Sequence, residues 1–169
     1  MNNVIGTVKE AIINCLKDRE VSHGVHIDYT DPNIGDIGLF PVGPTYVKKD
    51  ILGNPQYKMV FTLYSQLTSY NDYDRTNNAN FLASLTYSLN KLKNVPIEEQ
   101  IEDYLSSSEF SDYATEAFMM DEKTVQGKIL TLDCGNGMLY DYPNGDKNDG
   151  VRYQIQITVN YKLLTNEMN

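Results

Sequence analysis

The sequence has no tryptophan, only two cysteines, and no apolar run approaching the roughly 20 residues needed to cross a bilayer. Cys15 and Cys134 lie far apart in the 169-residue chain, which disfavours a disulfide framework or a cysteine-based zinc site. The N-terminal segment lacks the basic start and following apolar stretch of an export signal. We therefore expect one soluble domain in a reducing compartment, with no membrane partner.

Basic residues are also scarce. The chain has 14 Lys and Arg against 23 Asp and Glu, which gives a formal net charge of −9. The basic residues form no cluster larger than pairs such as Lys48-Lys49. Because readers of DNA and RNA usually carry a basic patch, sequence-specific nucleic-acid binding is disfavoured.

The acidic residues concentrate in one segment, between residues 98 and 122. Nine of the 23 acids lie there without a single Lys or Arg, and the 14 that remain equal the 14 bases of the whole chain. A run of charge usually forms a solvated surface helix and loop. The alternative is a segment that faces a basic partner or lines a channel that repels anions. The candidate partner- or lumen-facing residues are Glu98, Glu99, Glu102, Asp103, Glu109, Asp112 and Glu116.

Apolar spacing predicts two main helices and one short one. Apolar residues recur at helical spacing over residues 3–18, and again after the cap-rich start Thr76-Asn77-Asn78. Asn94-Val95-Pro96 is expected to end the second helix. The acidic segment carries Ile97, Ile101, Tyr104 and Leu105, which predicts a short third helix.

Alternating polarity predicts the strands. We expect strands at 25–29, 46–51, 57–66, 128–134, 138–142 and 151–163, with 57–66 in the middle of the sheet because both its faces are apolar. Gly53-Asn54-Pro55 and Gly135-Asn136-Gly137 are read as turns, the second as a hairpin turn. The last strand has one apolar face and one polar face. The candidate polar sheet face consists of Arg152, Gln154, Gln156, Thr158, Asn160 and Lys162.

This order of elements predicts an α+β fold. We expect a mostly antiparallel sheet with two main helices packed on one face, plus a short acidic helical segment. The whole chain, residues 1–169, is expected to form a single domain with an acidic insertion at about 97–122.

No group of residues has the spacing of a catalytic or cofactor site. His23 and His26 lie near Asp28 and Asp31, but a metal site there would lack further strong ligands. The loop 144–150 has oxygen ligands at alternate positions without the glycine and glutamate of a calcium loop. We expect no enzyme, no metal and no cofactor.

Tyrosine is abundant, with 13 residues in the chain. Several of them flank the acidic segment or precede it, and tyrosine offers a broad contact area with a polar tip. An alternative function is therefore a soluble ligand- or peptide-binding module that uses a tyrosine-lined face. The tyrosines concerned are Tyr70, Tyr73, Tyr87, Tyr104 and Tyr113.

Three segments form a recognisable series: the opening MNNVIGTVKEAIINCL, the strand YKMVFTLYSQLTSYND that leads into a helix, and the closing strand VRYQIQITVNYKLL. Together they resemble the tail terminator proteins, often called minor capsid proteins, of tailed phages of Gram-positive hosts and of phage tail-like bacteriocins. The resemblance covers roughly residues 1–93 and 124–164. The acidic segment is longer than the usual connection in that family, and Gln66 stands where a charged residue is expected.

The resemblance implies a structural virion protein. Such subunits assemble as six-membered rings that cap the completed tail tube and offer an attachment surface to the head connector or to a cap. The implied partners are copies of the same chain, the tube protein, the sheath where one is present, and the connector or cap. The implied location is the virion tail, assembled in the cytoplasm of the host bacterium.

Overall fold

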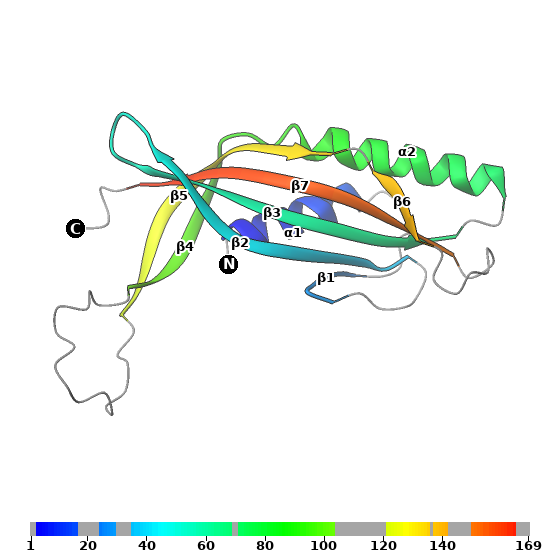
Figure 1. Cartoon of the computed structure of the whole chain (residues 1–169), viewed down its shortest axis with the longest axis horizontal. Coiled ribbons are helices and arrows are strands. Elements are labelled where there is room, and N and C mark those ends of the chain that lie inside the picture. Colours follow the sequence, from blue (N-terminus) through cyan, green and yellow to red (C-terminus); the bar gives the residue numbers. More distant parts are fainter. Residues whose placement is uncertain are drawn as a thin grey trace, which may run out of the picture.

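The computed structural model describes residues 3–16, 24–29, 35–68, 71–103, 121–135, 137–141 and 150–164. These parts of the chain form two helices and seven strands, which are labelled in Figure 1. In chain order they are α1 (Val4–Leu16), β1 (Val25–Ile27), β2 (Ile37–Lys49), β3 (Pro55–Leu67), α2 (Asp72–Leu89), β4 (Val95–Asp103), β5 (Asp121–Cys134), β6 (Met138–Asp141) and β7 (Val151–Leu163).

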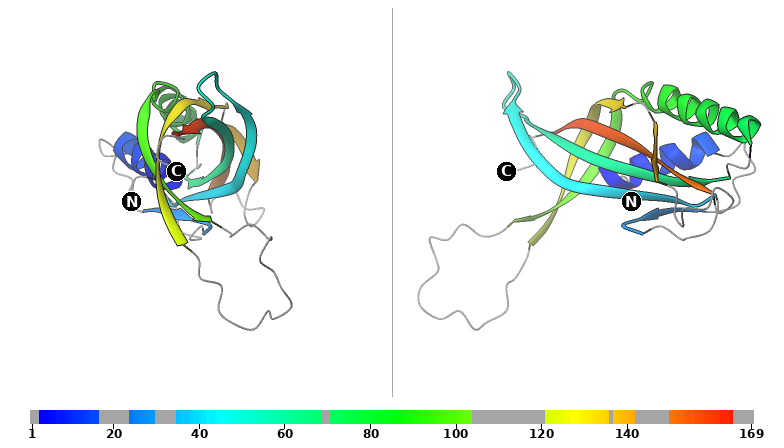
Figure 2. Two further views of the ribbon diagram at one scale, coloured as in Figure 1. Left: turned by 90° about the vertical axis from the view of Figure 1, so that its left-hand side faces the viewer. Right: turned by 45° about the vertical axis from the view of Figure 1, so that its right-hand side comes forward.

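All seven strands belong to one strongly curled sheet. Its order is β1-β2-β3-β7-β5-β4, and β6 also pairs with β7. The β1–β2 pair is parallel, whereas the other pairs are antiparallel. The sheet curls into a half-barrel, which is clearest when the molecule is viewed from its end in Figure 2.

The expected fold class, an α+β fold with two helices layered on one face of a sheet and a short acidic helix, was wrong. Most strand pairs are antiparallel and two main helices are present, but strands dominate the described chain and form a curled mixed half-barrel. The acidic helix does not form either, because residues 95–103 are strand β4, paired with β5 from Val95 opposite Ile129 to Asp103 opposite Asp121. Residues 104–120 lie outside the described residues.

Strand β7 has the bounds that the sequence predicts, Val151–Leu163. It lies between β3 on one side and β5 and β6 on the other. Its odd-numbered residues are all buried, and its even-numbered residues are at least partly exposed. The prediction for β3 is also confirmed, since β3 lies inside the sheet between β2 and β7.

One apolar core joins the sheet to both helices. Helix α1 contributes a stripe at four-residue spacing, as its sequence predicts, and α2 contributes a second stripe. Phe61 and Ile157, on the paired strands β3 and β7, are completely buried in the same core. The helical core residues are Val4, Val8, Ile12 and Leu16 on α1, and Phe81, Leu82, Leu85 and Leu89 on α2.

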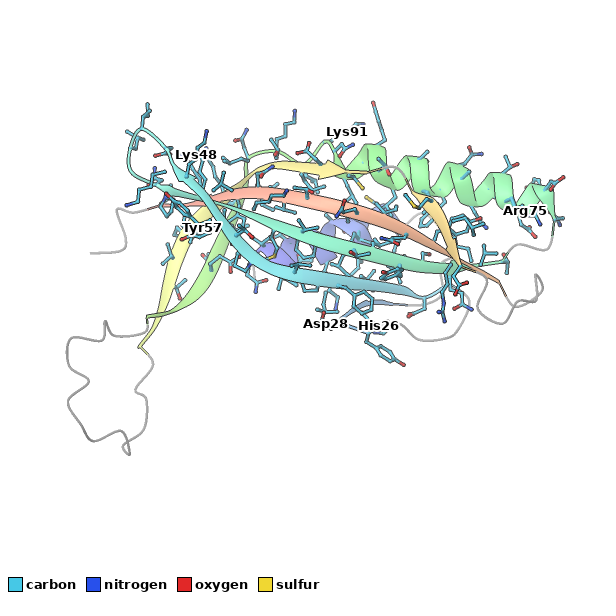
Figure 3. The ribbon with its side chains drawn as sticks, viewed as in Figure 1. His26, Asp28, Lys48, Tyr57, Arg75 and Lys91 are labelled. Carbon is cyan, nitrogen blue, oxygen red and sulfur yellow. The ribbon has the colours of Figure 1, made fainter. Side chains whose placement is uncertain are left out.

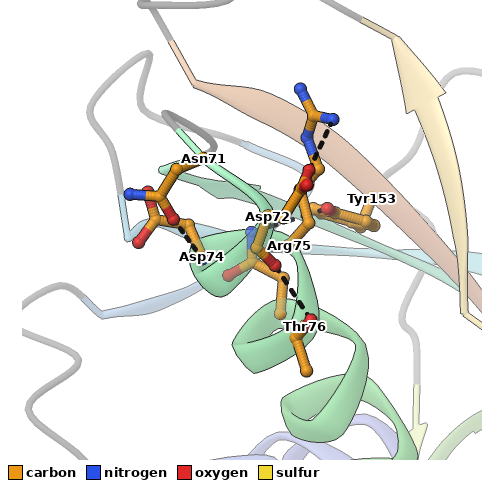
Figure 4. Close-up of polar contacts among 7 residues, drawn as sticks. Asn71, Asp72, Asp74, Arg75, Thr76 and Tyr153 are labelled. Atoms are coloured by element: carbon orange, nitrogen blue, oxygen red, sulfur yellow. Dashed lines mark hydrogen bonds and ion pairs between the residues drawn. The ribbon is translucent and has the colours of Figure 1, made fainter.

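Helix α2 begins earlier and ends earlier than its sequence predicts. The side chain of Asn71 caps its N-terminus by accepting a hydrogen bond from the backbone N–H of Asp74 at 2.9 Å (Figure 4). Arg75 is paired with Asp72 in the same turn at 3.4 Å. The helix ends at Leu89, and Pro96 lies in the edge strand β4, where a missing N–H is tolerated.

The expected hairpin turn at residues 135–137 was also wrong. Strands β5 and β6 both pair with β7, so they follow one another along the same edge instead of folding back on each other. Glycine suits this connection because a Cβ at Gly137 would lie 3.0 Å from Leu82 and 3.2 Å from Ile155. Helix α2 can therefore pack closely against the chain where β6 begins.

Candidate functional site

Two strand pairs project from one end of the molecule, to opposite sides. The first is the tip of the β2–β3 hairpin, here called the hairpin arm and defined as residues 42–58. The second is the far part of the β4–β5 pair, here called the acidic arm and defined as residues 98–103 and 121–126. Figures 1 and 2 show the two arms diverging from the same end in every view.

The hairpin arm is unusually exposed for a strand pair. All residues of β2 from 42 to 49 are exposed to solvent, including Val42, Tyr46 and Val47, whose exposed fractions reach 50–60%. Strand β1 covers β2 only from Ile37 to Leu39, so the outer edge of the arm has no pairing strand among the described residues.

The turn at the tip of the hairpin arm is held by the side chain of Asp50. Its Oδ1 accepts hydrogen bonds from the backbone N–H groups of Leu52 and Asn54, both at 2.9 Å. Its Oδ2 accepts from the Asn54 side chain at 3.1 Å and from the Lys162 ammonium at 2.9 Å. The hydrogen bond from Lys162 is the main reason why the pKa of Asp50 lies well below its usual range. These hydrogen bonds hold the turn in one defined conformation.

This built turn presents two apolar side chains to solvent. Ile51 is fully exposed and Leu52 has an exposed fraction of 74%. Fully burying a side chain of this type stabilises a protein by about 1.5–3 kcal/mol. Neither residue is singled out by periodicity, but an adjacent apolar pair inside an Asp-to-Asn turn is a signal that sequence reasoning could have used.

A row of three tyrosine rings joins the hairpin arm to the core. Tyr46 on β2 contacts Tyr57 on β3 edge to face at 6.0 Å between ring centroids, and Tyr57 stacks on Tyr161 of β7 at 5.6 Å. Tyr57 is labelled at this end of the molecule in Figure 3. Burial raises the pKa of Tyr161 above its ordinary value, and the nearby Glu99 and Tyr57 raise it further. The row anchors the arm through rigid side chains.

The outer edge of the hairpin arm is poorly suited to pairing with another strand. Two register shifts interrupt the β2–β3 ladder, one between Val42 and Thr45 and one between Tyr46 and Lys48. Pro44 lies inside the first of these bulges and has no N–H to donate. Bulges and prolines are the devices that protect sheet edges, so the arm offers its side chains more than its backbone.

Lysines gather around the hairpin arm. Lys48, Lys49 and Lys58 are exposed on the arm, and Lys128 is partly exposed on β5. Lys128 and Lys58 both lie beside β7, opposite Lys162 and Asn160 respectively. Figure 3 shows Lys48 at the end of the molecule from which the arm projects. A chain with a net charge of −9 therefore carries a local basic surface here.

The acidic arm concentrates carboxylates. Glu98 is exposed and its Oε1 accepts a hydrogen bond from Gln126 across the strand pair at 2.9 Å. Farther out, the register places Glu102 opposite Glu122 and Asp103 opposite Asp121. Both strands of this arm therefore contribute acidic residues at neighbouring positions of the ladder.

Glu99 is positioned differently from its acidic neighbours. It is half-buried, and its Oε1 accepts a hydrogen bond from the backbone N–H of Val4 at 2.7 Å, at the N-terminus of α1. Burial raises the pKa of Glu99 above its ordinary value, although this hydrogen bond opposes the shift. Of the candidate acidic residues, Glu98 faces solvent and Glu99 contacts α1. Glu102 and Asp103 lie on the arm, whereas Glu109, Asp112 and Glu116 lie outside the described residues.

The candidate polar face of β7 lies on the side of the sheet opposite the apolar core. Gln156 is exposed, and the other five residues are partly exposed. Two of the six have structural contacts: Asn160 donates to Thr131 of β5 at 3.0 Å, and Lys162 bonds Asp50. The remaining four candidates on this face are Arg152, Gln154, Gln156 and Thr158.

The histidine cluster considered from the sequence is only partly described. His26 Nε2 lies 3.0 Å from Oδ1 of the buried Asp36, and the His26 ring contacts Tyr29 (Figure 3 labels His26). His23 and Asp31 lie outside the described residues. In the parts of the chain that the structure describes, no three His, Cys, Asp or Glu residues gather closely enough to hold a metal ion.

Of the five tyrosines of the alternative binding face, two are described. Tyr73 and Tyr87 are exposed on α2, with exposed fractions of 74% and 66%, and Lys91 lies over the Tyr87 ring at 4.0 Å. Tyr70, Tyr104 and Tyr113 lie outside the described residues. The described residues therefore place only the α2 part of this set.

Neither the models of known protein families nor the curated protein sequences match this chain. Within the described ranges, neither helix combines the length and the apolar character that a membrane crossing requires.

Proposed function

We propose that this chain is a structural virion protein, a tail terminator subunit. Six copies would form a ring that caps the completed tail tube and provides the attachment surface for the head connector or for a cap. The particle would be assembled in the host bacterial cytoplasm. The tube protein, and a sheath protein in a contractile tail, would contact other faces of the same ring.

The hairpin arm is the observation that carries this proposal. Its turn is held by four hydrogen bonds to one carboxylate, yet it displays Ile51 and Leu52 to water. Exposed apolar groups on a rigid projection are typical of a surface that becomes covered by another protein. A subunit of a ring needs such a surface because it contacts two neighbours through two different patches.

Charge segregation supports the same proposal. Lysines surround the hairpin arm and carboxylates lie along the acidic arm. Two separate surfaces of opposite sign on diverging arms suit head-to-tail association, in which each copy contacts one neighbour through its basic surface and the other through its acidic surface. The resemblance of the opening helix, the central strand and the closing strand to tail terminator proteins supports a tail terminator ring as the assembly.

The experiment that tests the proposal is native mass spectrometry of the purified full chain over a range of concentrations, combined with negative-stain electron microscopy. We expect six-subunit species and ring-shaped particles with sixfold symmetry. A protein that stays monomeric at the highest concentration, and is also monomeric in the tail particle, would contradict the proposal. A symmetric dimer as the largest species would contradict it equally.

A further inference from the structure

We propose that the hairpin arm of one copy docks on the acidic arm of the next copy, and that this contact closes the ring. The inference rests on the proposed function and specifies its subunit interface. The occupant of the acidic arm is a second copy of this chain, because the chain itself supplies the complementary basic surface.

The hairpin arm brings both apolar and charged groups to this contact. Ile51 and Leu52 project at its tip, and Lys48 and Lys49 lie just before them in the chain, separated from Ile51 by Asp50. Asp50 is turned back toward Lys162 and the turn backbone, so its charge is already used within its own subunit. The outward-facing charge of the tip is therefore positive.

The acidic arm has the opposite charge, contributed by both of its strands. Glu102 is opposite Glu122 and Asp103 is opposite Asp121 in the strand register. Both strands of the arm therefore contribute acidic residues, and Glu98, nearer the core, is exposed to solvent. A basic surface laid across both strands would complement this acidic sequence.

The placement of the two arms allows a closed ring. They leave the same end of the molecule toward opposite sides (Figures 1 and 2). If all copies point the same end toward a common axis, each hairpin arm extends toward one neighbour and each acidic arm toward the other. This is a heterologous contact, which closes into a ring when the rotation between copies is right.

The contact uses side chains and not an added strand. Bulges and Pro44 interrupt the outer edge of the hairpin arm, which disfavours backbone pairing along its length. The tip residues, by contrast, are rigidly held and exposed. We therefore expect specificity to lie in Lys48, Lys49, Ile51 and Leu52.

Zero-length crosslinking tests the contact in the unmodified protein. Equal amounts of unlabelled and nitrogen-15-labelled full chain are mixed, reassembled and treated with a carbodiimide, which joins a lysine directly to a carboxylate that it touches. We expect mixed-isotope peptides that link Lys48 or Lys49 to Glu98, Glu102 or Glu122. Mixed-isotope links that all involve other surfaces would overturn the inference.

Charge reversal tests the same contact independently. Lys48→Glu combined with Lys49→Glu is expected to raise the concentration needed for half-assembly about tenfold or more. Adding Glu98→Lys and Glu102→Lys to that variant should restore assembly. The control is Lys91→Glu with Lys93→Glu, which makes the same change in net charge at exposed positions outside both arms and should assemble like the wild type.

Replacing the apolar residues at the tip of the hairpin arm is a third test of the contact. Ile51→Ser with Leu52→Ser should weaken assembly at least as strongly as the double lysine reversal does. Met138→Ser with Leu139→Ser removes exposed apolar residues on β6 and should leave assembly unchanged. Thermal unfolding of each variant as a monomer checks that the fold is retained. A wild type that never forms a ring would contradict the proposed function. A ring that forms equally well in all variants would contradict only the proposed contact between the two arms.

Discussion

The Glu99 carboxylate accepts a hydrogen bond from the backbone N–H of Val4 at 2.7 Å, across 95 residues of sequence. It completes the N-terminus of α1, where the Asn3 side chain also accepts from the backbone N–H of Gly6 at 2.8 Å. This carboxylate thus joins strand β4 to helix α1, although the sequence predicts that Glu99, as part of the acidic segment, faces a partner or the lumen. Its half-buried position gives it a testable pH dependence.

Replacing Glu99 by Gln is expected to leave the protein as stable as the wild type near neutral pH or to make it more stable. Glutamine keeps an oxygen acceptor for Val4 but removes the charge that burial disfavours. Because the pKa of Glu99 is raised, the wild type loses stability as the pH rises through that pKa. The advantage of the variant should therefore vanish below about pH 4.3, the usual Glu pKa. Urea unfolding at several pH values measures it.

Two variants serve as controls for Glu99. Glu98→Gln changes an exposed neighbour, so its free energy of unfolding should stay within about 0.5 kcal/mol of the wild type at every pH. Glu99→Ala removes the acceptor for Val4 and should destabilise the protein by about 1 kcal/mol. A Gln variant as unstable as the Ala variant would show that the negative charge itself is required.

Replacing Asp50 by Ala should loosen the tip of the hairpin arm without unfolding the core. The backbone N–H groups of Leu52 and Asn54 lose their acceptor, and Lys162 loses its partner. We expect faster amide hydrogen exchange at these two residues, measured by NMR, with core strands unchanged. Asp133→Ala, on the exposed side of β5, is the matched control and should leave exchange at the tip unaffected.

The pH dependence of the same turn has a defined sign. The pKa of Asp50 is lowered, mainly by its hydrogen bond with Lys162, so the carboxylate favours the folded turn above its unfolded pKa of about 3.9. This contribution is lost only as the pH falls from there toward the lowered pKa. Exchange at Leu52 and Asn54 should therefore stay slow relative to the Asp50→Ala variant down to about pH 4. Convergence of the two proteins at higher pH would contradict this account.

Sequence periodicity located the elements that carry a clean pattern. Strand β7 alternates over its whole length, and α1 repeats apolar residues every four positions, so both were predicted with nearly correct bounds. The prediction of a helix in the acidic segment was wrong because Ile97 and Ile101 are four residues apart. This spacing fits one face of a helix and also one face of a strand. Only the pairing of β4 with β5 distinguishes these possibilities.

The hairpin arm shows where sequence reasoning reached its limit. The turn at residues 53–55 was predicted. Only the last part of β2 was predicted as strand, because Pro41, Gly43 and Pro44 disfavour a regular strand. The ladder accommodates them with bulges, which no periodicity reveals. The exposure of Ile51 and Leu52 is likewise a tertiary property, since apolar residues in a turn are more often covered.

Replacing Gly137 by Ala should destabilise the protein by about 1–3 kcal/mol, because the added Cβ would lie 3.0 Å from Leu82 and 3.2 Å from Ile155. The nearest Leu82 atoms include its Cβ, which can move only with the α2 backbone. Gly43→Ala is the matched control, since nothing lies within 4 Å of its added Cβ. Thermal or urea unfolding of both variants measures the difference. Equal stability would show that α2 shifts freely over β6.

The assembled state should weaken as salt is added, because exposed charges more than about 10 Å apart are screened at about 0.1 M ionic strength, and closer exposed pairs are screened in more concentrated salt. Sedimentation velocity between about 0.05 M and 0.5 M NaCl should show the ring fraction falling. The variant with Lys48→Glu and Lys49→Glu should respond less, because it has lost the attraction that salt removes. Rings that grow more abundant with salt in both proteins would mean that Ile51 and Leu52 dominate the contact and that the lysines contribute little.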